Sequence, residues 1–96
     1  MKIKFDSKEL KNICKTSNIS FLGLFGSHAV GEQRLNSDVD LLVDFNKTKS
    51  LFEKGRVLVK LQNLFRKEVD LVSRKNIKPS IKPYIEKQLV TLYEEK

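Results

Sequence analysis

The run from residue 26 to residue 40 lies between two apolar segments and constrains the fold more than any other part of the chain. It opens with Gly26-Ser27 and ends with Asp38 and Asp40 at the head of the second apolar segment. Residues two apart on a strand point to the same face, so the two carboxylates are expected to project side by side. A Gly-Ser turn lets backbone amides approach a phosphate at a helix start.

The acidic pair points to a metal ion. Two carboxylates held this close repel each other unless a cation lies between them. Mg²⁺ suits such oxygen ligands, because it commonly takes one or two carboxylates together with substrate phosphates. A phosphate-binding turn next to a magnesium site provides the groups that nucleotidyl transfer requires. Asp70 adds a third acid, a charge within the apolar segment 68–73.

Hydrophobic periodicity predicts helices alternating with strands. Helices are expected over residues 7–17, from 27, over 51–66 and over 84–93, and strands over 19–25, 39–45 and 68–73. Ser50 with Glu53 three residues later predicts a capping box, and Ser80 is expected to cap the last helix. The spacing predicts that one side of the third helix is buried through Leu51, Leu58, Leu61 and Phe65. The last helix is expected to carry Ile85, Leu89 and Leu92 on one side.

This order of elements predicts an α/β fold, a small mixed sheet with flanking helices. The first two strands are expected to pair antiparallel, and the helix between the second and third implies a right-handed crossover between parallel strands. The start of strand 68–73 would then lie beside the start of strand 39–45. Three carboxylates and the Gly26-Ser27 turn are predicted to converge at one end of the sheet.

Composition bounds the class of protein. The chain of 96 residues is expected to form a single domain over 1–96, with the 40% hydrophobic and 32% charged residues of a globular protein. It shows no apolar run long enough to span a membrane and no signal-peptide core, so a cytoplasmic location is expected. Cys14 is the only cysteine, which excludes an intramolecular disulfide, and its apolar helix face predicts a place in the core.

The net charge of +7 is compatible with nucleic acid as a partner. The lysines are scattered and do not interleave with aromatic residues in one block, which favours a solvated basic surface. Arg34, Lys47 and Lys49 could neutralise phosphate charge, and nothing in the sequence ranks them. His28, the sole histidine, is given no role, and Asp44 is interpreted as a surface charge.

The motif closely resembles the signature of the minimal nucleotidyltransferases of the DNA polymerase β superfamily, approximately G-S-x-A-R-G-x-x-x-x-x-S-D-x-D-L. This chain has Gly26-Ser27-His28-Ala29-Val30-Gly31 and, five residues later, Ser37-Asp38-Val39-Asp40-Leu41. The spacing matches without a gap, and the order of elements fits most of the chain. The main departure is Val30, where the family usually has arginine.

The resemblance implies a Mg²⁺-dependent nucleotidyltransferase that moves AMP, or another nucleoside monophosphate, from a triphosphate to a hydroxyl of a partner protein. Asp38 and Asp40 would hold divalent metal under the triphosphate. Asp70 would bind the second of two ions and help to deprotonate the acceptor. Gly26 and Ser27 would contact the β- and γ-phosphates. In this family the partner is often a HEPN-domain ribonuclease toxin, and the nucleotidyltransferase is the antitoxin that adenylylates one of its tyrosines.

Two other functions stay open. Val30 favours a binding module whose acidic site is vestigial and which neutralises its partner by stoichiometric contact, without ATP. The +7 charge allows RNA or DNA binding, which would weaken steeply with added salt.

Overall fold

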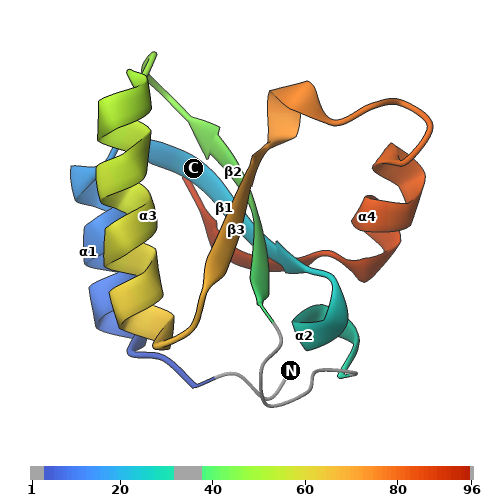
Figure 1. The fold of residues 1–96 in the computed structure, drawn as a ribbon, viewed down its shortest axis with the longest axis horizontal. Helices are drawn as coiled ribbons and strands as arrows, with labels where there is room; N and C mark the ends of the chain where they lie inside the picture. Colours follow the sequence, from blue (N-terminus) through green and yellow to red (C-terminus); the bar gives the residue numbers. More distant parts are fainter. Residues whose placement is uncertain (1–3, 32–37, 96) are drawn as a thin grey trace.

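The chain folds around one four-stranded mixed sheet (Figure 1), seen in a computed structural model that describes residues 4–31 and 38–95. The elements follow one another as α1 (Ser7–Thr16), β1 (Ile19–Phe25), α2 (Ser27–Val30), β2 (Val39–Phe45), α3 (Leu51–Phe65), β3 (Val69–Ser73), the 3₁₀ turn η1 (Arg74–Asn76), α4 (Lys82–Gln88) and β4 (Val90–Glu94). The strands are ordered β3-β2-β1-β4. β1 pairs antiparallel with β2 and β4, whereas β2 and β3 run parallel. The predicted α/β class and the pairing of the first three strands are confirmed.

The main core lies on the face of the sheet that α1 and α3 cover. These two helices lie side by side in Figure 1, and α4 lies on the other side of the sheet. Leu22 and Leu24 of β1 pair with Val43 and Leu41 of β2, and all four side chains are buried. Cys14 of α1 is buried beside them as predicted, and burial raises the pKa of its thiol to about 12. No helix in the described ranges is long and apolar enough to cross a membrane.

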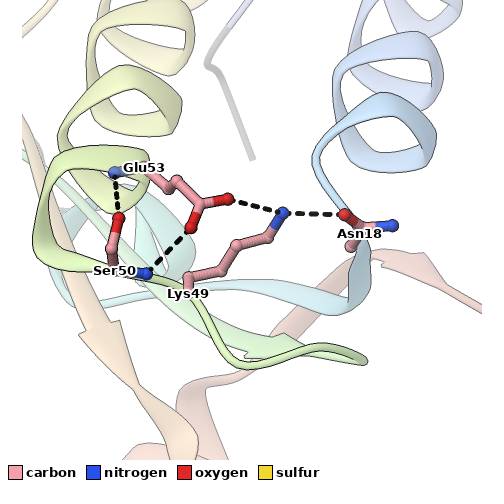
Figure 2. A network of polar contacts seen from close by, with 4 residues as sticks. All are labelled: Asn18, Lys49, Ser50 and Glu53. Atoms are coloured by element: carbon pink, nitrogen blue, oxygen red, sulfur yellow. Dashed lines mark hydrogen bonds and ion pairs between the residues drawn. The ribbon is translucent and has the colours of Figure 1, made fainter.

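A polar network joins the start of α3 to the end of α1 (Figure 2). Ser50 and Glu53 form the predicted capping box, in which the serine oxygen accepts from the Glu53 amide and the Glu53 carboxylate accepts from the Ser50 amide. Lys49 donates to Asn18 Oδ1 at 2.7 Å and lies 3.7 Å from Glu53 Oε2. Asn18 itself takes the left-handed conformation, with φ 58°, at the turn into β1. The network fixes the position from which α3 starts.

The helix expected over residues 84–93 is wrong in its second half. α4 ends at Gln88, and Leu89 has an extended backbone, with ψ 126°, that turns the chain into β4. Residues Val90 to Tyr93 are β-branched, aromatic or apolar, and they pair with the edge of β1. Leu92 therefore lies on a strand. The same apolar spacing suits a short strand or a helix, and the free edge of β1 decides between them.

Two helix details also differ from expectation. The inner side of α3 is formed by Val57, Leu61 and Phe65, whereas Leu51 is 87% exposed. The capping box places Leu51 at the first position of the helix, outside the stripe that faces the core. Ser80 caps nothing in the structure, because α4 begins after Ile81 and has no side-chain cap.

We predict that Ser50→Ala lowers the free energy of unfolding by about 1 kcal/mol, because it removes the acceptor for the Glu53 amide. Ser80→Ala is the matched control, since it removes the same hydroxyl at a position that caps no helix. Urea unfolding of both variants measures the difference. Equal losses in the two variants would contradict the role of the capping box.

Candidate active site

The sheet register places the acidic residues at one end of the strands. Asp40 lies beside Asp70 in the parallel β2–β3 ladder and opposite Phe25 in the antiparallel β1–β2 ladder. Asp38 directly precedes β2, and Gly26 directly follows β1. The structure therefore brings the three carboxylates and the Gly-Ser turn together, on strands that the sequence predicted with nearly the right bounds.

The carboxylates of Asp38, Asp40 and Asp70 interact electrostatically. The pKa of Asp40 is raised, first by burial of its carboxyl group and then by the negative charges of Asp70 and Asp38. His28 opposes this shift and lowers the pKa. His28 is only 2% exposed on α2, so it is a buried neighbour of the acidic cluster. A single histidine at a variable motif position carried no signal that could have revealed this in the sequence.

Gly26 is required by the geometry of the turn. Its φ of 77° and ψ of −157° lie in a region that side chains rarely adopt. A Cβ at this position would also collide with Oδ2 of Asp40. The absence of a side chain therefore lets the turn and the acidic strand approach each other closely.

Gln88 is a neighbour of this turn that the sequence did not indicate. Its Oε1 accepts a hydrogen bond of 3.2 Å from the Gly26 amide. Gln88 is the last residue of α4, and it reaches Gly26 because β4 pairs with β1. Only the fourth strand, which the sequence interpretation missed, explains the contact.

The donor chemistry fits a hard divalent cation. In the described part of the chain, no group of three His, Cys, Asp or Glu side chains is arranged to hold a metal ion as it stands. Asp40 nonetheless carries a raised pKa caused in part by Asp38 and Asp70, and a cation among the three would relieve that repulsion. Mg²⁺ normally completes a small carboxylate set with substrate phosphates and water, so a few protein oxygens suffice.

Other candidate residues lie elsewhere. Ser37 and Arg34 lie outside the described residues. Lys47 and Lys49 follow the far end of β2, and Lys49 is held by Asn18 and Glu53, so neither lysine belongs to the acidic end of the sheet.

Asp44, which follows the motif, and Val30, which departs from it, are both within the described residues. Asp44 was expected to be a surface charge, but it is half-buried and lies 3.9 Å from Arg74. The Arg74 guanidinium also stacks on the Phe21 ring, 4.4 Å from its centroid. Val30, the departure from the motif, is 45% exposed on α2.

Comparison with known sequences gives consistent matches. The sequence model of the family described as "Polymerase beta, Nucleotidyltransferase" matches residues 8–96. Protein adenylyltransferase MntA of Thermococcus cleftensis is 32% identical over 80 residues, which are 83% of this chain and 81% of that protein. A Methanocaldococcus jannaschii protein named "Putative protein adenylyltransferase MJ1379" is 37% identical over 86 residues, 86% of this chain and 83% of that protein.

Solved structures share the fold. A crystal structure of a toxin-antitoxin with AMP-PNP superposes with a TM-score of 0.76 at 22% identity, over 95% of this chain and 75% of that one. A structure of tri-AMPylated Shewanella oneidensis HEPN toxin with MNT antitoxin gives a TM-score of 0.66 at 18% identity, over 92% and 69% of the two chains.

We predict that Gly26→Ala is more damaging than Gly31→Ala. Gly31 lies in the left-handed region, with φ 77° and ψ 19°, where alanine costs about 1–2 kcal/mol, whereas Gly26, with φ 77° and ψ −157°, lies in a region that is essentially restricted to glycine. Only Gly26 would also bring a Cβ into Asp40, whereas nothing lies within 4 Å of a Cβ at Gly31. Urea unfolding should therefore show a clearly larger loss for Gly26→Ala, and similar losses would contradict the close approach.

We predict that Asp40→Asn stabilises the metal-free protein at pH 7. Because the folded-state pKa of Asp40 is raised, ionisation costs the folded state more than the unfolded state, and stability falls as pH rises through the folded pKa. The gain should shrink as pH falls below the ordinary aspartate value, where the group is protonated in both states. Denaturant midpoints in EDTA measure this gain, and a lower midpoint for the variant at pH 7 would contradict the raised pKa of Asp40.

Proposed function

Because this chain belongs to the polymerase beta nucleotidyltransferase family, we propose that it is a Mg²⁺-dependent protein adenylyltransferase that transfers AMP from ATP to a hydroxyl of a partner protein. The observation that carries the proposal is the placement of Asp40 between Asp38 and Asp70 and against Gly26. The names of the relatives, which are protein adenylyltransferases, support the choice of transferred group and acceptor.

The residues would divide the work as follows. Gly26 and Ser27 would contact the β- and γ-phosphates, and Asp38 and Asp40 would hold divalent metal. Asp70 would bind the second ion and help to deprotonate the acceptor hydroxyl. When bound, two Mg²⁺ ions would activate the attacking oxygen and neutralise charge on the leaving group.

The transfer is a substitution at the α-phosphorus. The acceptor oxygen forms a bond to that phosphorus while Asp70 helps to remove its proton. The bond from the α-phosphorus to the oxygen that bridges to the β-phosphate breaks, and pyrophosphate leaves with the bonding electrons. The Gly26-Ser27 turn would contact this leaving group and stabilise the charge that develops on it.

We propose that the acceptor is a tyrosine of a HEPN-domain ribonuclease toxin, which makes this chain the antitoxin. The support comes from the structural relatives, which include a toxin-antitoxin with AMP-PNP and an AMPylated HEPN toxin with its MNT antitoxin. The transfer would place a charged, bulky nucleotide on the toxin.

A second candidate function is neutralisation by binding alone. Val30 favours it, because the family usually has arginine at this position and the valine side chain is 45% exposed where that cation would stand. In that case toxin activity would be suppressed by Asp38→Asn protein in the absence of ATP.

We predict that Asp38→Asn and Asp40→Asn each lower AMP transfer to the toxin by roughly 100-fold or more, because metal coordination supplies several kcal/mol of transition-state stabilisation. Asp44→Asn is the matched control on the same strand, outside the carboxylate cluster. Incorporation of label from α-³²P-ATP measures transfer, and calorimetry with and without Mg²⁺ measures ATP binding. Undiminished transfer by Asp38→Asn would overturn the assignment.

A further inference from the structure

The outer side of α3 carries apolar side chains that the core does not use. Leu51, Phe52 and Val59 are 87%, 71% and 54% exposed. They lie on the helix beside the inner stripe of Val57 and Phe65, and they line a shallow hollow. Neighbouring exposed apolar side chains on one helix mark an interaction surface.

This hollow continues into a groove between α3 and β3. The groove measures about 520 Å³, and Leu51 and Gly55 line both the groove and the outer hollow. β3 is an edge strand, and no described strand pairs with its outer side. Asp70 of β3 is also among the residues that line the groove, so the groove reaches the strand that carries one of the three carboxylates of the proposed active site.

The other end of the groove is basic. It joins a second hollow of about 380 Å³ through the shared residues Phe45, Lys54, Ser73 and Asn76. Four lysines line this second hollow, namely Lys47, Lys49, Lys54 and Lys75. Lys49 is engaged by Asn18 and Glu53, whereas the other three form no ion pair with any residue in the described ranges. We call the two hollows and the groove between them the α3–β3 surface.

We infer that the α3–β3 surface docks the acceptor protein through a segment that carries both acidic and apolar side chains; this inference rests on the proposed function. The lysines supply charge complementary to acidic residues, and Leu51 and Phe52 supply a place for apolar ones. Asp70 is among the residues that line the groove, so a segment bound along it would lie against the edge strand that carries one of the carboxylates. α4 and Gln88 lie over the other face of the sheet, so a nucleotide held at Gly26 and a docked protein would approach from different sides (Figure 1).

Nucleic acid fits this surface less well than protein. A sugar-phosphate backbone would find lysines in one hollow, and Arg56 and Lys60 in the outer one, but the groove between the two hollows is lined mostly by apolar side chains. Asp70, which pairs with Asp40 in the sheet, is also among the residues that line the groove and would repel a phosphate near it. A protein segment can present acidic side chains to the lysines and apolar side chains to the groove between the two hollows.

The test uses the full-length protein and two fluorescein-labelled synthetic peptides of 20 residues, one alternating glutamate with leucine and the other lysine with leucine. We expect fluorescence anisotropy to show binding of the acidic peptide only. Lys54→Glu/Lys75→Glu and Phe52→Ser should each weaken that binding about tenfold or more. The control is Lys11→Glu/Lys15→Glu, which makes the same charge change on exposed positions of α1 and should bind as the wild type does.

Other outcomes overturn the inference. It fails if the acidic peptide does not bind, if the α1 control loses binding equally, or if a 20-nucleotide single-stranded RNA binds more tightly and competes with the peptide. Calorimetry with Mg-ATP distinguishes a failure of the docking inference from a failure of the proposed adenylyltransferase function. Groove variants should bind Mg-ATP as the wild type does, whereas absence of Mg-ATP binding in the wild type would contradict the proposed function itself.

Discussion

The placement of three acidic residues and the Gly26 turn at one end of the sheet is the constraint around which the candidate site is arranged. Asp40 is held partly buried between Asp38 and Asp70, so its charge is disfavoured in the absence of a cation. The fold tolerates this because its main core lies on the opposite face, between the sheet and α1 and α3. Packing of the apolar core stabilises the fold, so the protein can hold the disfavoured charge of Asp40 at the other face of the sheet. Such separation is common where an active site must hold like charges together.

The directions of the three strands bring the Gly26 turn and the acidic residues together in one candidate site. Antiparallel pairing of β1 with β2 brings the end of one strand to the start of the next, and the parallel β3 adds its own start to the same end. Gly26, Asp40 and Asp70 are thereby adjacent although they come from three segments. Gly26 completes the arrangement, because any side chain there would occupy the space of the Asp40 carboxyl group.

The parts of the structure that could be predicted are those governed by local spacing. The predicted strand placed Asp40 at its head with Asp38 directly before it, and the Ser50 capping box was visible in four consecutive residues. β4 could not be predicted in the same way, because its identity depends on the free edge of β1, which is remote in sequence. The Gln88 contact was hidden for the same reason. Leu51 is exposed because the capping box makes it the first residue of α3, outside the stripe that faces the core. The spacing of apolar residues alone does not define where the helix begins relative to the core.

The pairing of β4 with β1 has a consequence for how the protein is made. Glu94 pairs with Phe21, and Gln88 reaches back to the Gly26 amide, so both contacts close most of the chain into a loop. Such long-range closure is slow compared with helix formation and needs both partners to be present. Because synthesis runs from the N-terminus, the turn at Gly26 can gain its Gln88 neighbour only after the segment that carries α4 has left the ribosome. A nascent chain thus holds its first strand and all three carboxylates before the turn beside them is fully supported.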